Sequence, residues 1–542
     1  MNTDRQLLSG DEAVALGALH AGVRLGTGYP GTPSTEILET LDQLGGKAQW
    51  SPNEKVALEV GIGVAFAGAR ALVTMKHVGL NVAADPLFTA SHTDVEGGLV
   101  VVSADDPGMA SSQNEQDNRH YARAAAVPML EPADSQQAYD YTRLAFALSE
   151  RWKIPVLLRL TTRVCHAKTV VHPRAPEAGS GEPVFVRDVP ARVMIPAFAK
   201  PAHRRLRAKL AEIEAWNEAE GPAQLTPGSR ELGILSTGVS AVHAREAAPD
   251  ASHLSIGMTY PLPMERLRAF AQTVDRLVVI EEGDPVLVDS LRAAGIPAEG
   301  KPESFRFGEL DVARVRRILE RDTSPEPVPP RGKPPELCQG CAHRGVFEAL
   351  RDLDCIVSGD IGCYTLGVLP PFSAMDTCVC MGASIGVGLG LRHVLPEEQA
   401  RRVVSVIGDS TFVHSGITGI AEMVYNPPPT GHLVLILDNG TTAMTGLQEH
   451  PGTGRALDHS PTNRLDFAAL ARAMGVKNVQ VVQTNDKKLS MKDLIADLLA
   501  RPELSLVVAQ QPCVLAAPKI RVYDRAAASE LKVEACAAAA DD

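Results

Sequence analysis

Short apolar runs alternate with helix-like stretches along most of this chain, and this alternation constrains its fold more than any other feature. Apolar runs lie at 99–102, 156–158, 277–280, 403–407 and 433–437. Ala- and Leu-rich helical patterns, such as 54–71, separate them. Strands that alternate with helices predict parallel sheets, so the expected fold class is α/β. No window approaches eighteen uninterrupted apolar residues, so we expect no membrane span.

Breaks in this pattern divide the chain. Six prolines within 323–337 deny backbone donors to helices and sheets, which indicates a linker. We predict three parallel-sheet α/β domains, at 1–190, 230–322 and 338–517. A connector at 191–229 and the Pro-rich linker at 323–337 would separate them. A tail at 518–542 would follow.

Charge and cysteine content narrow the function classes. Lys and Arg number 53 against 65 Asp and Glu, a net charge of −12, which argues against a general nucleic-acid or acidic-membrane binder. The N-terminus does not look like a signal peptide, so a cytoplasmic, reducing location is the default expectation. The nine cysteines would then stay reduced, and a cluster of them would more often bind metal than form disulfides.

Two apolar strands end in residues suited to a metal and a phosphate. The first runs into Gly408 and Asp409, and the second, thirty residues on, into Asn439, Gly440 and Thr441. Ligands in open α/β sheets bind at the carboxyl ends of strands. A carboxylate, an amide oxygen and a backbone carbonyl suit Mg²⁺ that bridges a diphosphate. The alternative is a pair of ordinary turns, which would suffice for either dipeptide alone.

Four further motifs carry a resemblance to a known family. They are Cys-Gln-Gly-Cys-Ala-His-Arg at 338–344, the glycine-rich stretch 359–367, Cys-Val-Cys-Met-Gly-Ala-Ser-Ile-Gly at 378–386 and the stretch 438–446. In this order they resemble the α subunit of indolepyruvate ferredoxin oxidoreductase, in the 2-oxoacid:ferredoxin oxidoreductase superfamily. The resemblance covers about residues 8–515. It implies a thiamine diphosphate-binding fold with pyrimidine and diphosphate domains, and a transketolase-C-terminal-like middle domain.

The same resemblance assigns the cofactor residues. It places the Mg²⁺ ligands at Asp409, Asn439 and the carbonyl of Thr441. Gly408 and Ser410 would contact the diphosphate, and Met381 and Gly382 would lie near the cofactor.

A carboxylic acid must also lie beside the aminopyrimidine ring of the cofactor. Glu54 stands thirteen residues before Ala67-Gly68-Ala69, which is the family spacing. Glu59 is the competitor, and without the family spacing the two glutamates could not be separated.

Three loops are candidates for contact with the substrate. In 29–34, the family uses the threonine that matches Thr32, although Thr32 or Ser34 could simply cap a helix. Lys76 and His77 follow a strand and would bind the carboxylate or carbonyl of a 2-oxo acid, although such residues usually lie at the surface. The stretch 111–119 is too polar for a core, and Arg119 is a possible anion partner.

Four of the cysteines follow the family order for a 4Fe-4S cluster. Cys338 and Cys341 form a Cys-x-x-Cys, and Cys363 and Cys513 follow a Gly and a Pro. A Cys₄ zinc site or a redox thiol pair are the alternatives. Cys378 and Cys380 would pack near the cofactor. The remaining three, Cys165, Cys355 and Cys536, have no partner pattern.

The reaction implied is oxidative decarboxylation of a 2-oxo acid, most consistent with an arylpyruvate such as indolepyruvate, to its acyl-CoA. Coenzyme A would be the cosubstrate, and a smaller β subunit would complete an α₂β₂ assembly. The family usually adds a C-terminal ferredoxin-like domain that this sequence lacks, so electrons would pass to ferredoxin or another acceptor by another route. The alternatives are a non-oxidative thiamine-dependent decarboxylase or carboligase, and a non-catalytic scaffold subunit of a redox complex.

Overall fold

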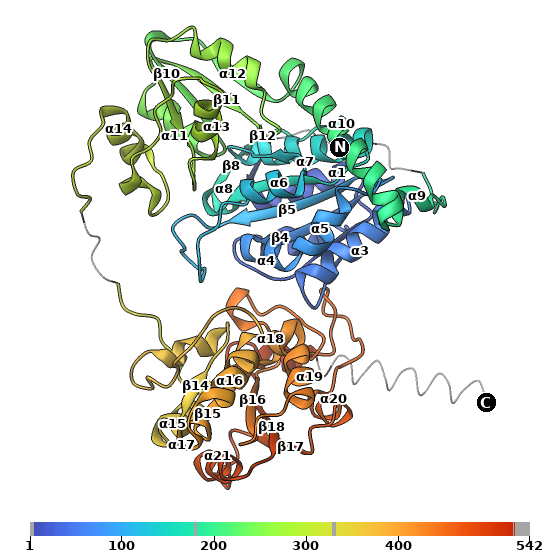
Figure 1. The fold of residues 1–542 in the computed structure, drawn as a ribbon, viewed down its shortest axis with the longest axis vertical. Coiled ribbons are helices and arrows are strands. Elements are labelled where there is room, and N and C mark those ends of the chain that lie inside the picture. The colour runs from blue at the N-terminus through green and yellow to red at the C-terminus, as the bar shows by residue number, and fades with distance from the viewer. Residues whose placement is uncertain (1–4, 178–180, 328–331, 524, 526–542) are drawn as a thin grey trace. The chain divides into compact units, whose positions relative to one another are not determined.

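The computed structural model describes residues 5–177, 181–327, 332–523 and 525 of the chain (Figure 1). The chain forms two compact units, Met1–Val328 and Pro329–Asp542. Both are mixed α/β structures with mostly parallel sheets, as predicted. Within the described ranges, no helix has both the length and the hydrophobicity to cross a bilayer.

The first unit is built around a seven-stranded sheet with the order β12-β6-β7-β5-β4-β2-β3. All neighbours are parallel except β12 and β6. Its strands are β2 (Leu25–Gly28), β3 (Ala48–Trp50), β4 (Ala71–Lys76), β5 (Leu99–Asp105), β6 (Met129–Leu130), β7 (Val156–Thr161) and β12 (Met258–Tyr260). A two-stranded antiparallel ribbon, β1 (Gln6–Ser9) with β8 (Lys168–Val171), lies outside this sheet.

Helices cover both faces of the seven-stranded sheet, as its continuously buried strands require. On one face, Val73 and Val101 share a core with Leu58 and Leu87 of α3 and α5. The helices before and between its strands are α1 (Gly10–His20), α2 (Thr35–Gln43), α3 (Glu54–Phe66), α4 (His77–Val82), α5 (Ala84–Ala90), α6 (Arg119–Ala125), α7 (Ser135–Trp152) and α8 (Thr162–His166). Helices α1 and α7 pack together.

The strand order reverses at β2, and this reversal positions a site. From β2 the chain goes outward to β3 on one side and then returns to β4 on the other side. The loops after β2 and β4 therefore leave the carboxyl edge of the sheet in opposite directions. Open α/β sheets bind ligands in the crevice between two such loops. Residues 29–34 follow β2, and 77–81 follow β4, whose last residue is Lys76.

A second sheet in the same unit has the order β13-β10-β11-β9, with β9 antiparallel to β11. The strands are β9 (Ala223–Thr226), β10 (Ser229–Thr237), β11 (Ala251–Ile256) and β13 (Leu277–Ile280). The helices of this region are α9 (Val189–Arg192), α10 (Pro196–Ala219), α11 (Ser240–Ala247), α12 (Met264–Ala271), α13 (Val286–Ala293) and α14 (Val312–Glu320). The stretch 191–229 thus contains the 24-residue helix α10 and an edge strand of this sheet.

The second unit contains a five-stranded parallel sheet with the order β14-β15-β16-β18-β17. Its strands are β14 (Ile356–Ser358), β15 (Val403–Gly408), β16 (His432–Asp438), β17 (Asn478–Gln483) and β18 (Leu504–Gln510). Its helices are α15 (Arg344–Asp352), α16 (Ala383–Val394), α17 (Glu397–Ala400), α18 (Asp409–Thr411), α19 (Ile417–Tyr425), α20 (Phe467–Ala473) and α21 (Met491–Ala500).

Alternate residues of β16 face two separate cores. Leu433, Leu435 and Leu437 pack with α15 and α21. Val434 and Ile436 pack with α16, α19 and α20. Because both faces are covered by helices, the polar residues at the strand ends gather at the edge of the sheet.

Candidate active site

Asp409 is the centre of the site in the second unit. It begins α18 directly after the buried strand β15 and is only 3% exposed. Its carboxylate accepts backbone N–H groups from Ser410 at 2.9 Å and from Gly440 at 2.8 Å, and His450 Nε2 lies 3.2 Å away. Burial raises the pKa of Asp409, but His450 and the two amides outweigh burial and hold the pKa below its usual value. The carboxylate is therefore ionised and fixed in orientation.

The turn after β16 adds the other predicted metal ligands. Strands β15 and β16 pair in register from Val404 to Gly408, so their carboxyl ends lie side by side. Asn439 Oδ1 accepts the backbone N–H of Thr441 at 3.1 Å. The Thr442 hydroxyl donates to Ser410 Oγ at 2.9 Å, which ties the two turns together. The structure thus brings together Asp409, Ser410, Asn439 and Thr441, an oxygen-rich set that suits Mg²⁺.

The start of α16 forms another part of this site. Gly382 caps the helix at φ +87°, and a Cβ there would lie 2.5 Å from Ser415 Cβ, so only glycine fits. Asp360 accepts the N–H groups of Gly382 at 2.9 Å and Ser384 at 3.0 Å. Met381, half-buried, precedes Gly382.

Sequence reasoning did not single out Asp360, His343 or His450. Asp360 follows strand β14 and Gly359, which is the same strand–Gly–Asp pattern as Gly408-Asp409, so the signal was present. The two histidines are buried and distant in sequence from Asp409. Burial lowers the pKa of His343 to about 4, although the charge of Asp409 opposes this. His343 lies within the motif 338–344, whereas His450 belongs to none of the motifs identified in the sequence.

The four cysteines predicted as cluster ligands lie near one another. Burial, and then the charges of Cys513, Cys341 and Cys338, together raise the pKa of the Cys363 thiol to about 11. Such interactions require proximity, although the four residues span 175 positions. The backbone N–H of Cys513 donates to the carbonyl of Asn439 at 2.9 Å, which connects the thiols with the Asn439 turn.

The remaining cysteines are dispersed. Cys378 and Cys380 are exposed, and Cys378 Sγ lies 3.7 Å from the carbonyl of Asp360. Cys355 is half-buried and Cys165 is buried in the first unit. Cys536 lies outside the described residues.

In the first unit, burial separates the two candidate glutamates. Glu54 starts α3, behind the side-chain cap of Asn53, and is 5% exposed. Gly79 packs directly on it, because a Cβ at residue 79 would lie 2.5 Å from Glu54 Oε1. Glu59 is exposed and pairs with Lys55 on the surface of the same helix. Glu54 is therefore an acid enclosed by protein, whereas Glu59 is not.

Lys76 ends β4, His77 begins α4, and both are buried. Lys76 Nζ donates to the carbonyl of Ser111 at 2.7 Å, and burial lowers its pKa although Asp106 opposes this. His77 Nε2 lies 3.1 Å from the carbonyl of Asn114. The polar loop 111–118 therefore lies against the end of β4.

The loop after β2 reaches the same place. A Cβ at Gly31 would lie 3.1 Å from Lys76 Cβ, and Thr32 beside it is half-buried. Ser34 is the N-cap residue of α2, but its side chain donates to the carbonyl of Gly31 instead of capping the helix. The structure thus gathers Thr32, Lys76 and His77 at the reversal in strand order.

Arg119 does not fit the expectation of an anion partner. It is buried, and its guanidinium is bound by Asp117 and Glu281. It also donates to the carbonyls of Glu282 and Asp284. The Arg119 N–H groups thus donate to acceptors within the protein, so the guanidinium is not available to a substrate carboxylate.

Comparisons with known proteins agree with this geometry. Residues 16–192 match the family pyruvate flavodoxin/ferredoxin oxidoreductase, thiamine diP-binding, and residues 360–509 match thiamine pyrophosphate enzyme, C-terminal TPP binding domain. The indolepyruvate oxidoreductase subunit IorA of Archaeoglobus fulgidus is 38% identical over 94% of this chain and 87% of the relative. The same subunit of Methanothermobacter thermautotrophicus is 38% identical over 96% and 88%. A 2-oxoglutarate synthase subunit KorA from the latter organism is 26% identical over 52% of this chain and 88% of the relative.

Proposed function

The chain belongs to the family of indolepyruvate oxidoreductase subunits IorA, and from this premise we propose that it is the α subunit of an enzyme that converts an arylpyruvate such as indolepyruvate to its acyl-CoA. The chemistry is thiamine diphosphate-dependent oxidation of a 2-oxo acid. The observation that carries the proposal is the fixed Asp409 carboxylate beside Asn439 and Thr441, in the region that matches a TPP-binding domain.

The residues around Asp409 fit Mg²⁺ and a diphosphate. Each Asp409 oxygen accepts one backbone N–H group and keeps lone-pair capacity for an ion. We assign Asp409, Asn439 and the Thr441 carbonyl as the Mg²⁺ ligands. Gly408, Ser410, Met381 and Gly382 would contact the cofactor. The absence of a side chain at Gly408 and Gly382 lets Tyr364 and Ser415 pack against these turns. When bound, thiamine diphosphate supplies stabilisation of the carbanion left by loss of CO₂.

Other residues would handle protons and the substrate. Glu54 would hold a proton at the aminopyrimidine ring, and its burial supports this role because an enclosed acid exchanges protons with its partner rather than with water. Lys76 and His77 would orient the substrate carboxylate and carbonyl, with Thr32 beside them. Lys76 is suited to this because a buried ammonium binds an anion more strongly than an exposed one.

The four cysteines would carry electrons through a 4Fe-4S cluster. The four thiols interact electrostatically, so they could supply the four thiolates that such a cluster requires. The thiamine chemistry favours iron–sulfur over zinc, because zinc has no redox chemistry and the electrons must leave one at a time.

The balanced reaction defines the partners. One 2-oxo acid anion and coenzyme A give acyl-CoA, CO₂, one proton and two electrons. The electrons would leave one at a time through the cluster to ferredoxin or another acceptor. A smaller β subunit would complete the enzyme, in an α₂β₂ assembly. The existence of a partner subunit is supported by the name of the relatives, which are themselves called subunits.

The test is anaerobic co-expression with the proposed β subunit, followed by viologen reduction with indolepyruvate, phenylpyruvate, pyruvate and 2-oxoglutarate. We expect CoA-dependent reduction, fastest with the aryl substrates. Aldehyde release without dye reduction would instead indicate a non-oxidative decarboxylase. Failure of every 2-oxo acid would reject catalysis and leave a scaffold subunit.

A matched pair of cysteine variants tests the cluster. Cys363→Ala should lose iron, sulfide and visible absorbance, whereas Cys355→Ala, which removes a half-buried thiol outside the quartet, should keep them. Equal iron content in the two variants would overturn the cluster assignment. Zinc without iron or sulfide in anaerobically purified enzyme would also overturn it.

A further inference from the structure

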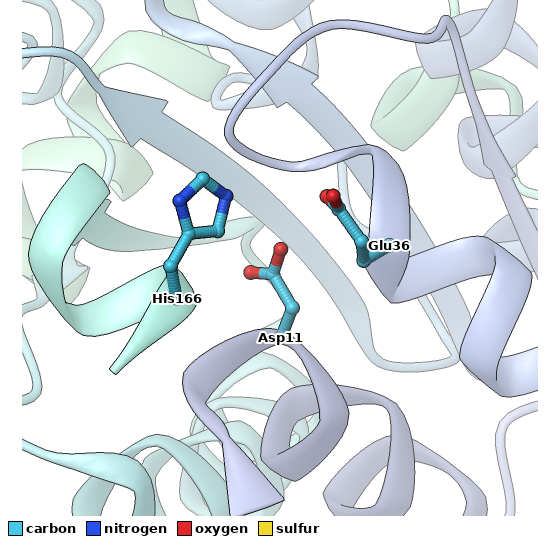
Figure 2. A group of neighbouring side chains, drawn as sticks. All are labelled: Asp11, Glu36 and His166. Carbon is cyan, nitrogen blue, oxygen red and sulfur yellow. The ribbon is translucent and has the colours of Figure 1, made fainter. Parts of the chain in front are cut away.

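Three side chains from separate elements of the first unit converge on one point. Asp11 lies in α1, Glu36 in the first turn of α2, and His166 at the end of α8. One ligand atom of each lies within 4.8 Å of those of the other two. Figure 2 shows the Asp11 carboxylate between the His166 ring and the Glu36 carboxylate. This acid–acid–imidazole cluster is separate from the residues used in the proposed function.

The Asp11 carboxylate lacks the partners that a buried acid requires. It is 1% exposed, and neither of its oxygens accepts a well-formed hydrogen bond, although the Cys165 thiol and the Glu36 carboxyl lie close beside it. Burial, followed by the charge of Glu36, raises the pKa of Asp11 well above its usual value. The neighbouring Glu12 differs, because it accepts from Ser9 N at 2.7 Å and pairs with Lys168. A buried, unpartnered carboxylate is costly unless a ligand compensates it.

A cavity of about 270 Å³ gives access to this carboxylate. Glu36, His166 and the Cys165 thiol also line it. Glu36 and His166 are exposed side chains and can move towards an ion, whereas Asp11 is fixed in the wall. The site therefore combines one rigid ligand, two adjustable ligands and space for water.

We propose that Asp11, Glu36 and His166 bind a divalent transition-metal ion of the Zn²⁺ type. Imidazole suits Zn²⁺ better than Mg²⁺ or Ca²⁺, and carboxylate oxygens complete the set. Ligands about 2.1 Å from a tetrahedral ion lie about 3.4 Å apart, so small rotations of Glu36 and His166 close the site. Water from the cavity takes the fourth position.

The bound ion would join the starts of α1 and α2 to the end of α8. Helix α2 follows the loop 29–34, and the Gly31 backbone in that loop lies against Lys76. The ion would therefore stabilise the part of the first unit from which this loop projects. The expected effect is on metal content and on stability, and the site needs no contact with substrate.

The test compares Asp11→Asn with Glu39→Gln, which removes a charge from the same cavity wall without removing a ligand. The proteins are the full complexes with intact iron content, dialysed against micromolar Zn²⁺ and analysed by mass spectrometry. We expect Asp11→Asn to hold one zinc per chain fewer than the wild type, and Glu39→Gln to hold the same number. Zinc bound at other sites should be equal in the three proteins, so it does not affect the difference between them.

The exposed ligand gives a second variant for the case in which Asp11→Asn fails to fold. His166→Ala should also lose one zinc, and it should lose the rise of a few degrees in unfolding temperature that Zn²⁺ gives the wild type. EDTA should reverse that rise. Equal zinc content and equal thermal response in wild type and His166→Ala would overturn the proposal and leave Asp11 and Glu36 as acids that share a proton.

Discussion

Gly79→Ala offers a direct test of how closely the first unit holds Glu54. Gly79 lies in α4, and an added Cβ would lie 2.5 Å from Glu54 Oε1 and 2.7 Å from Cγ. Ordinary contact begins at 3.4 Å, so the carboxyl group must move by roughly 0.9 Å. Glu54 is buried and cannot swing into solvent, so the displacement stays within the site.

The effect on catalysis should exceed the effect on stability. A displacement of about 1 Å in a reacting group lowers turnover about 100-fold, which is about 2.7 kcal/mol in the barrier. An extra methyl group in a packed region lowers the free energy of unfolding by about 1–3 kcal/mol. Alanine in place of a helical glycine raises it by up to about 1 kcal/mol, which offsets part of that loss. The free energy of unfolding should therefore fall by only about 0–2 kcal/mol.

The assays are kcat for viologen reduction by indolepyruvate and urea unfolding of the same preparations. Gly63→Ala is the matched control, because Gly63 lies in α3 with Glu54 but a Cβ there meets nothing within 4 Å. Gly63→Ala should keep the wild-type kcat, and its free energy of unfolding should rise by up to about 1 kcal/mol. Wild-type turnover in Gly79→Ala, or an equal loss in Gly63→Ala, would refute the reasoning.

Three further predictions follow from burial. Glu54→Gln should lower kcat more than 100-fold, whereas Glu59→Gln should stay within about twofold of the wild type; similar kcat values would contradict the assignment. Asp117→Asn should lower the free energy of unfolding by about 3–5 kcal/mol in urea, because it removes one of the two carboxylates that pair with the buried Arg119, and a loss below about 1 kcal/mol would count against this. Burial lowers the pKa of His432 to about 3, so its contribution to stability is present above about pH 6.5 and is lost as the pH falls towards 3. Between pH 7.5 and 4, His432→Gln should lose about 3 kcal/mol less stability than the wild type, and equal losses would exclude this role.

Sequence reasoning succeeded where a local pattern determines the position of a side chain. Asp409 and Asn439 each follow an apolar strand, and neighbouring parallel strands end at one edge, so their proximity could be predicted. It did not separate Glu54 from Glu59 without the family spacing, because both lie on one helix and burial depends on what packs against each face. Asp11 and His166 were missed because 155 positions separate them and neither belongs to a motif.

Arg119 shows why polar composition alone is ambiguous. A polar segment such as 111–119 can contact a ligand, or it can be part of a buried ionic network whose partners are distant in sequence. Here the Asp117–Arg119 pair is completed by Glu281. Arg159 joins the network through Asp117 and also pairs with Asp105 and Glu131.

That network has a consequence for the site. Buried charges are tolerated only when they are paired, so the pairing fixes the backbone at residues 117–119. The same segment continues back to Ser111 and Asn114, whose carbonyl groups contact Lys76 and His77. Arg119 therefore anchors one end of the loop that contacts Lys76 and His77, and its influence on a substrate anion would be exerted through that loop.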